Sequence, residues 1–137
     1  MKRTVLFLCT GNSCRSQMAE AIVNARLGAD WEAFSAGTQP TGEVHPLAVR
    51  ALQEIGIEFH GRSKSVNEFK YIAFDLVITV CDHAAENCPL WLGNGQQAHL
   101  GFPDPVQAQG TEAEIMTVFR AVRDEIEAKV IDFITRR

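Results

Sequence analysis

Runs of hydrophobic residues along the chain predict a set of β-strands. Residues 4–8 and 74–80 form nearly continuous apolar stretches, as expected of parallel strands whose two faces are both covered. Shorter segments at 31–35 and 99–102 have the composition of two further strands. The pattern therefore predicts a sheet of four strands, with 74–80 in a central position.

Apolar residues at helical spacing predict three helices between and after these strands. The first includes 18–25. The second begins at Pro46, a residue suited to the first turn of a helix, and ends at Gly56. A capping box at 111–114 marks the start of the third, whose apolar face continues over 115–133.

The alternation of strands and helices predicts a single α/β domain spanning residues 1–137. We expect a small doubly wound, four-stranded parallel sheet with helices on both faces. Ligands of such sheets bind at the carboxyl ends of the strands. Cys9, Cys81 and Asp104 each follow a predicted strand, so we expect all three at the same rim of the sheet.

The composition restricts the partners and the compartment. Apolar residues make up 46% and charged residues 22% of the chain, which is typical of a soluble globular protein. A net charge of −4 without a basic stripe argues against nucleic acid and membranes as partners. The apolar run near the N-terminus is too short for a signal peptide. We expect a cytoplasmic monomer, in which four cysteines indicate chemistry or metal binding rather than structural disulfides.

The segment from Cys9 to Ser16 predicts an oxyanion site with a nucleophile at its floor. Backbone N–H groups of a small-residue loop and of the following helix N-terminus converge on an anion, and Arg15 adds a planar fork of donors. The same field favours the thiolate of Cys9, to which Ser16 donates a hydrogen bond. The predicted oxyanion-binding residues are Thr10, Gly11, Asn12, Ser13, Cys14 and Arg15. The alternative is a tight turn with an incidental buried cysteine, and a buried core position is the interpretation we favour for Cys14.

Asp104 is the candidate general acid. Pro103 and Pro105 flank it and stiffen the backbone that presents its carboxylate. A thiolate that attacks a tetrahedral oxyanion must expel an oxygen, which leaves more easily once it is protonated. The alternative, a simple turn, is less favoured because the Cys9 loop is expected on the same rim.

Cys81 and Cys88 predict a redox switch. Seven positions apart in a helix, they would be separated by about 10.5 Å of rise, whereas a disulfide requires Cα atoms closer than about 7 Å. The pair therefore bonds only if the segment unwinds, which is the behaviour of a bistable element. The alternative is two unrelated core thiols.

A metal site is the less favoured interpretation of the cysteines. The spacings Cys-x4-Cys and Cys-x6-Cys match poorly to structural zinc sites, and zinc would neutralise the nucleophile. The four histidines form no ligand pattern; they are His45, His60, His83 and His99. We expect neither a metal nor a cofactor.

With these motifs in place, the chain resembles the thioredoxin-coupled arsenate reductases, which share the fold of low-molecular-weight protein tyrosine phosphatases. The resemblance covers nearly the whole length. The segments that carry it are 9–20, 34–37, 79–82, 88–89, 102–105 and 108–112. The three-cysteine arrangement is specific to the reductase branch.

The resemblance implies a role in arsenic detoxification, by the following reaction. Cys9 attacks arsenate held by the loop and Arg15, while Asp104 protonates the departing oxygen. Cys81 then attacks Cys9 and releases arsenite, Cys88 attacks Cys81, and thioredoxin reduces the resulting disulfide. Weak hydrolysis of aryl phosphates is implied as a side activity.

One position departs from the family pattern. Some members bind potassium near the loop through residues that correspond to Asn12, Glu20 and Ser35 and an acidic residue downstream. This chain has Lys64 at the acidic position. We predict that its ammonium group replaces the ion.

Two other functions remain as alternatives. A low-molecular-weight tyrosine phosphatase needs the same loop and acid, but it would not need Cys81 and Cys88, and aromatic residues typically follow its aspartate. Val106 and Gln107 follow here. A non-catalytic thiol sensor is less favoured, because nucleophile, arginine and acid are all present. Glutaredoxin or small thiols are alternatives to thioredoxin as electron donor.

Overall fold

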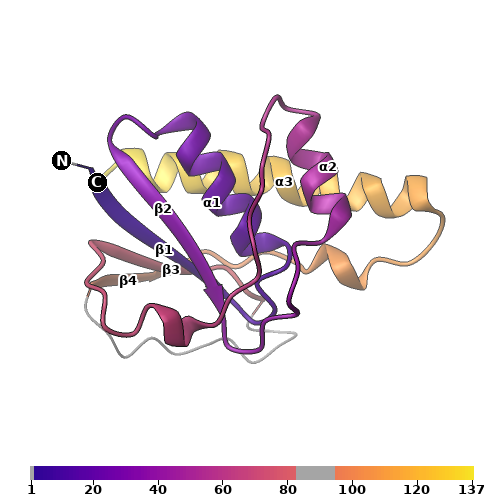
Figure 1. Cartoon of the computed structure of the whole chain (residues 1–137). Helices are drawn as coiled ribbons and strands as arrows, with labels where there is room; N and C mark the ends of the chain where they lie inside the picture. Colours follow the sequence, from indigo (N-terminus) through magenta and orange to yellow (C-terminus); the bar gives the residue numbers. More distant parts are fainter. Residues whose placement is uncertain (1, 83–94) are drawn as a thin grey trace.

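A computed structural model describes residues 2–82 and 95–137 of the chain. It contains a four-stranded parallel sheet with strand order β2-β1-β3-β4, which confirms the predicted α/β fold class. The described α-helices lie on one side of this sheet, where they share one core with it (Figure 1). The strands are β1 (Arg3–Cys9), β2 (Trp31–Gly37), β3 (Leu76–Thr79) and β4 (Gln96–His99), and the helices are α1 (Arg15–Arg26), α2 (Pro46–Gln53) and α3 (Glu112–Thr135), with 3-10 turns η1 (Val66–Glu68) and η2 (Pro105–Gln107).

Alternate residues of the central strands bury two separate apolar layers. Val5 and Phe7 of β1 and Ile78 of β3 face the α-helices and belong to the larger core. Leu6 and Leu8 face the opposite side and pack in a smaller core with aromatic residues of the segment around η1. Both faces of β1 are therefore covered, which explains its continuous apolar sequence.

The two faces of the sheet carry different elements in the described part of the chain. Within the two described stretches, α1, α2 and α3 all pack on the same face (Figure 1). The opposite face carries the 3-10 turn η1 and its flanking chain, where Phe69 and Phe74 supply the buried side chains. In the described part of the chain, the second face therefore carries a 3-10 helix and the first face carries the α-helices.

The last strand begins earlier than predicted. It spans Gln96–His99 rather than 99–102. The prediction is wrong because β4 is an edge strand with mostly exposed residues, so it lacks the apolar run that marks a buried strand. The chain beyond it still lies beside the end of β3, since Leu100 N and Phe102 N donate to the carbonyls of residues 79 and 80.

The helix boundaries follow the predicted signals. Pro46 is the first residue of α2, and the capping box of α3 is present, with Thr111 and Glu114 each bonding the other's backbone N–H. None of the helices in the described part of the chain has the length and apolarity to cross a membrane.

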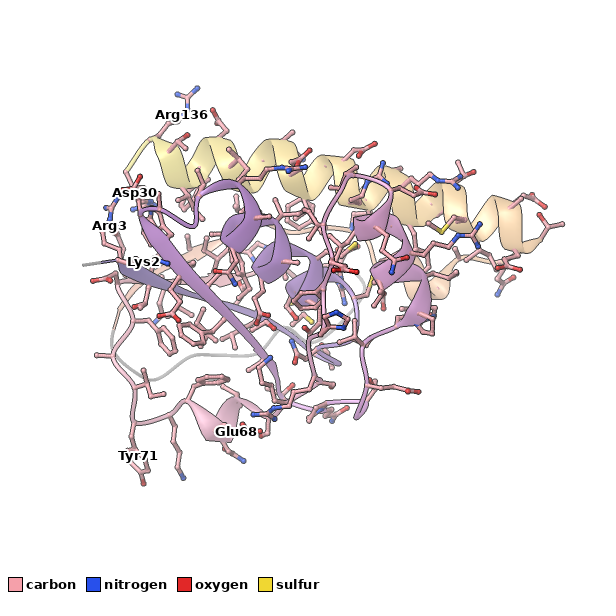
Figure 2. All side chains as sticks on the ribbon, turned by 45° about the horizontal axis from the view of Figure 1, so that its top comes forward. Lys2, Arg3, Asp30, Glu68, Tyr71 and Arg136 are labelled. Carbon is pink, nitrogen blue, oxygen red and sulfur yellow. The ribbon has the colours of Figure 1, made fainter. Side chains whose placement is uncertain are left out.

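The two ends of the sheet differ in character. Figure 2 shows Lys2, Arg3 and Asp30 together at the end where β1 and β2 begin, and Tyr71 is 92% exposed on a neighbouring loop. The opposite end, where the strands finish, holds Cys9 and the predicted anion loop. The candidate chemistry therefore lies at the carboxyl ends of the strands, as expected for a parallel sheet.

An ion-pair network joins α2 to α3 and gives a testable stability prediction. Arg120 donates to both oxygens of Glu54 at 2.8 and 2.9 Å, and Arg123 donates to the same carboxylate at 3.0 Å. The hydrogen bonds from Arg120, more than the other neighbours, lower the pKa of Glu54 from 4.5 to about 2. A carboxyl whose pKa is depressed on folding stabilises the fold above its unfolded pKa and loses this effect as pH falls through the folded value.

We therefore expect Glu54→Gln to lower the melting temperature at neutral pH. The difference from the wild type should hold from pH 7 to about 5 and shrink between pH 4.5 and 2. Thermal melts followed by circular dichroism over this range measure it. A difference that stayed constant down to pH 2 would contradict the assignment of the depressed pKa to Glu54.

Candidate active site

The loop between β1 and α1 is held from outside by the backbone that follows β2. Three of its carbonyl groups accept hydrogen bonds from backbone N–H groups of that segment. The pairs are Gln39 to Thr10, Thr41 to Gly11 and His45 to Ser13, at 2.9, 3.0 and 2.8 Å. Because the C=O and N–H of one peptide point in opposite directions, the N–H groups of the loop are left facing inward.

Two backbone features allow this tight loop. Asn12 has a φ of 49°, the left-handed conformation that asparagine tolerates better than most residues. Gly37, at the end of β2, approaches so closely that a Cβ there would lie 2.4 Å from the Thr10 carbonyl oxygen. Any larger residue at 37 would push the loop away from the sheet.

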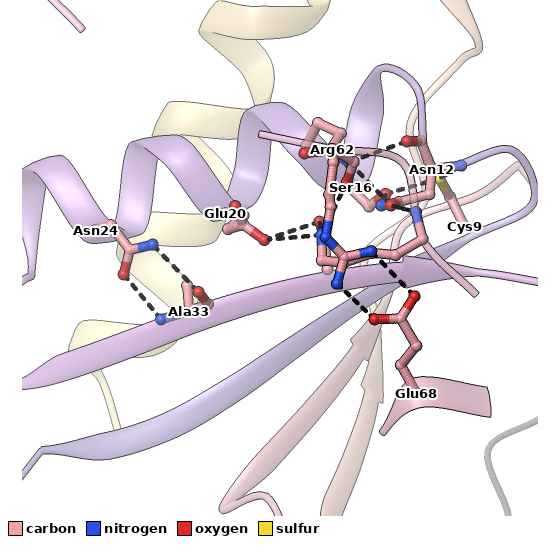
Figure 3. A network of polar contacts seen from close by, with 11 residues as sticks. Cys9, Asn12, Ser16, Glu20, Asn24, Ala33, Arg62 and Glu68 are labelled. Carbon is pink, nitrogen blue, oxygen red and sulfur yellow. Dashed lines mark hydrogen bonds and ion pairs between the residues drawn. The ribbon is translucent and has the colours of Figure 1, made fainter. Parts of the chain in front are cut away.

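Cys9 lies at the floor of the loop. Its Sγ atom accepts a hydrogen bond from Asn12 N at 3.3 Å and lies 2.9 Å from the Ser16 hydroxyl (Figure 3). Asn12 Nδ2 donates to the Ser16 oxygen at 2.8 Å, so this oxygen is engaged as an acceptor and its own proton is available for the sulfur. Two hydrogen-bonding groups therefore lie against the Cys9 sulfur.

Arg15 is buried at the start of α1 and forms one wall of the site. Its Nη1 donates to the Phe102 carbonyl at 3.2 Å, and its Nη2 lies 3.7 Å from Asp104 Oδ2. The first turn of α1 carries no acidic residue, and Cys14 at its N-cap makes no side-chain cap. Helix N-terminal N–H groups without such a cap favour a bound anion.

Asp104 lines the same pocket as Cys9, on the rim of the sheet where it was predicted. One carboxylate oxygen accepts a hydrogen bond from Val106 N at 3.1 Å, which caps η2. The other faces Arg15, and a quarter of the side chain is exposed. The turn that was the alternative interpretation is thus present, and the carboxylate also faces the anion site.

These residues enclose a pocket of about 340 Å³. Its described lining consists of Cys9, Thr10, Gly11, Asn12, Ser13, Cys14, Arg15, Gln39, Thr41, Asp104, Val106 and Gln107. Gln39 and Thr41 were not predicted, because they come from the segment after β2 and reach the site only through the backbone contacts described above. Val106 and Gln107 come two and three residues after Asp104, so their place near it follows from the sequence.

Cys14 behaves as a core residue that also reaches the pocket. It is 3% exposed and packs in the larger core. Burial, followed by the charges of Asp104 and Cys9, raises the pKa of the Cys14 thiol well above its ordinary value. Cys14 therefore stays protonated at neutral pH and is a poor candidate for the nucleophile.

Of the other two candidate cysteines, the structure describes Cys81 but not Cys88. Cys81 is fully buried two residues after β3 and belongs to the same apolar core as Cys9. It does not appear among the described residues that line the pocket. Cys88 lies outside the described residues, so its predicted exchange with Cys81 remains a prediction.

The Lys64 ammonium occupies the predicted position beside the loop. It lies 3.6 Å from Glu20 Oε1 and donates to Ser35 Oγ at 3.3 Å and to the Arg62 carbonyl at 3.1 Å. Ser35 also donates to Glu20, at 2.9 Å. Burial outweighs the attraction between the two charges, so the pKa of Glu20 is raised and that of Lys64 is lowered. A cation of the protein itself thus faces the carboxylate.

Metal binding finds no site in the described part of the chain. No group of three or more histidine, cysteine, aspartate or glutamate side chains gathers there in a way that could hold an ion. The four-cysteine zinc site that the sequence disfavoured would need Cys88, which lies outside the described residues.

Comparisons with known proteins agree over most of the chain. The family model of low molecular weight phosphotyrosine protein phosphatases matches residues 4–136. An arsenate reductase of Halalkalibacterium halodurans is 46% identical over 133 residues, which are 96% of this chain and 95% of that protein. A solved structure of an arsenate reductase in the phosphate binding state has a TM-score of 0.76 and 29% identity, covering 98% of both chains. The thioredoxin-dependent arsenate reductase of Corynebacterium glutamicum has a TM-score of 0.67 and 26% identity, covering 99% of this chain and 64% of that one.

Proposed function

Because this chain belongs to the low molecular weight phosphotyrosine protein phosphatase family and is similar to arsenate reductases, we propose that it reduces arsenate to arsenite through three cysteines. The observation that carries the proposal is the position of the Cys9 sulfur. It lies at the floor of an anion pocket, within 2.9 Å of the Ser16 hydroxyl and 3.3 Å of a loop N–H. The pocket offers a tetrahedral oxyanion both its donors and a nucleophile.

In the proposed first step, arsenate binds between the inward N–H groups of the loop and the Arg15 guanidinium. The Cys9 thiolate attacks arsenic and forms a sulfur–arsenic bond. One arsenate oxygen leaves as water, with the proton that Asp104 donates. Asp104 faces Arg15 at 3.7 Å and lines the same pocket as Cys9, so the acid and the nucleophile border one anion site.

In the proposed second step, Cys81 attacks the Cys9 sulfur. The sulfur–sulfur bond forms as the sulfur–arsenic bond breaks, and the electron pair of that bond reduces arsenic to arsenite. Cys88 then attacks Cys81, which frees Cys9 as a thiolate and leaves a disulfide between Cys81 and Cys88. Thioredoxin reduces this disulfide; the name of the Corynebacterium glutamicum relative supports this choice of donor.

Hydrolysis of aryl phosphates is the second candidate activity. The loop holds phosphate and arsenate by the same donors, and a phosphate-binding relative has the same fold. The described pocket lining includes no aromatic side chain to stack on a phenyl ring, and Val106 and Gln107 stand beside the acid. Phosphatase activity should therefore be weak.

The experiment that tests the proposed function couples arsenate to the oxidation of NADPH by thioredoxin reductase and thioredoxin. We expect NADPH oxidation to depend on arsenate, on thioredoxin and on the enzyme. Replacing thioredoxin with glutaredoxin and glutathione should give markedly less turnover. Equal turnover with glutathione would contradict the choice of donor, and no turnover with any donor would contradict the reductase function.

The position of Lys64 predicts insensitivity to potassium. Because its ammonium already faces Glu20 and Ser35, exchange of sodium for potassium should leave kcat/KM for arsenate unchanged. Lys64→Asp removes the ammonium and supplies a further oxygen ligand, so that variant should gain activity with potassium but not with sodium. Assays of both proteins in matched sodium and potassium buffers measure this. A clear rise of the wild-type kcat/KM in potassium would contradict the prediction.

A further inference from the structure

Gln17 is a fully buried amide on α1 that makes no contact with the pocket. Its Nε2 atom lies within hydrogen-bonding distance of three oxygens: 2.9 Å from Asn12 Oδ1, 3.0 Å from the Asn12 carbonyl and 2.7 Å from the Arg62 carbonyl. If the amide were rotated by 180°, its oxygen would face these three acceptor oxygens without a proton between them. The surroundings therefore fix the orientation of the amide. Gln17 thus ties the anion loop to the segment that contains residue 62.

This arrangement leaves one buried polar atom of Gln17 without a hydrogen bond from the described residues, which a side chain kept only for packing would not do. The other atom of the amide, Gln17 Oε1, is buried and receives no hydrogen bond from any described residue. An unsatisfied buried acceptor is unfavourable, and an aliphatic side chain of the same length would avoid it. The three contacts made by Nε2 therefore indicate a role of Gln17 in the loop.

Those contacts decide how the Asn12 side chain is turned. Asn12 Oδ1 accepts from Gln17 Nε2 and from Lys64 N at 2.9 Å each, so the oxygen of this amide faces away from Cys9. The nitrogen must then face Ser16, to which it donates at 2.8 Å. Because the Ser16 oxygen is occupied as an acceptor, its own proton is available for the Cys9 sulfur at 2.9 Å.

We propose that Gln17 is a positioning residue for the nucleophile: through Asn12 and Ser16 it directs a hydroxyl proton at the Cys9 sulfur and so favours the thiolate. Figure 3 shows Asn12, Ser16 and Cys9 together in the network of contacts that carries this effect. The inference rests on the proposed role of Cys9 as the attacking thiolate. It adds a residue that touches neither the anion nor the sulfur.

The charged and titratable groups around Cys9 are separate from this chain of contacts. Arg15 and Asp104 face the site from α1 and from the start of η2, and Cys14 adjoins it in the loop. The Lys64 and Glu20 pair lies beside Ser35. A substitution of Gln17 by a neutral residue leaves all of these charges unchanged, so its effect on Cys9 isolates the hydrogen-bond chain.

The test is the pH dependence of Cys9 alkylation by iodoacetamide, since only the thiolate reacts. Tandem mass spectrometry of the peptide that contains residues 9 and 14 assigns the modification to Cys9. Gln17→Met keeps the length of the side chain but removes the donor. Its alkylation midpoint should move to higher pH by about one unit, which is the size of one hydrogen bond to a charged group. The shift is partial because the Lys64 N–H still holds Asn12 Oδ1.

Asn24 supplies the matched control. It is an amide on the same helix that bonds Ala33 N at 2.8 Å and the Ala33 carbonyl at 3.1 Å, with no link to Cys9 (Figure 3). Asn24→Leu should lose stability but keep the wild-type midpoint. Equal midpoints in folded Gln17→Met and wild type, or equal shifts in both variants, would overturn the proposal.

A second substitution keeps the test decisive if Gln17→Met does not fold. Gln17→Leu is likewise neutral and offers no donor to Asn12, so its midpoint should also move to higher pH. An unchanged midpoint would overturn the proposal. Alkylation needs no arsenate; failure of the proposed function would instead appear as absent arsenite formation by a wild type with a normal alkylation profile.

Discussion

Replacement of Cys9 by serine is expected to abolish both arsenate reduction and aryl phosphate hydrolysis. Removal of a catalytic nucleophile costs roughly 10⁴-fold or more in rate. Serine keeps the size of the side chain, but its hydroxyl is not ionised at neutral pH, and it cannot form the disulfide with Cys81 that delivers two electrons to arsenic. The NADPH-coupled assay and release of p-nitrophenol from its phosphate ester measure the two activities.

Cys14→Ser is the control for this substitution. Cys14 is a buried, protonated thiol in the same loop, so its replacement should perturb the packing but leave both reactions measurable. Turnover of arsenate by Cys9→Ser above the rate without enzyme would show that another thiol is the nucleophile.

Replacement of Cys81 by serine is expected to separate the two activities. Hydrolysis of an aryl phosphate needs the anion loop, Cys9 and Asp104, and water completes that reaction. Reduction of arsenate needs a second thiol, which attacks the Cys9 sulfur and breaks its bond to arsenic. The variant should therefore lose multiple turnover with arsenate and keep its phosphatase activity near the wild-type value.

The position of Cys81 makes this separation a fair test. It is buried beyond the end of β3 and is absent from the described pocket lining, so serine there should leave the anion site intact. Cys88→Ser should behave in the same way. Without the Cys88 thiol, the disulfide between Cys9 and Cys81 cannot be exchanged for one between Cys81 and Cys88. Normal arsenate turnover by either variant would refute the relay of three cysteines.

The anion loop could be predicted because its parts are contiguous. A strand, a small-residue loop with a cysteine and an arginine, and a helix follow one another in the sequence, and local geometry alone brings their donors together. Asp104 could be predicted because parallel strands end at one rim. The place of the Lys64 ammonium was predicted only from the resemblance to the family's potassium site, and the structure puts it beside Glu20.

Other features depend on contacts that the sequence does not display. Gln39 and Thr41 reach the pocket because backbone N–H groups after β2 bond the loop carbonyls, and no side-chain pattern marks such contacts. Gln17 follows Arg15 and Ser16 in the first turn of α1, and this local sequence does not reveal that its amide bonds Asn12 and the Arg62 carbonyl. The edge strand β4 lacks the apolar run on which strand prediction relies.

A single turnover without thioredoxin shows whether the thiols of the enzyme itself reduce arsenate. Reduction of arsenate to arsenite takes two electrons, which two thiols supply when they form one disulfide. Fully reduced enzyme mixed with excess arsenate should yield one arsenite per chain and lose two thiols, with the disulfide mapped by mass spectrometry to Cys81 and Cys88. Free thiols unchanged in number, with no arsenite formed, would contradict the account.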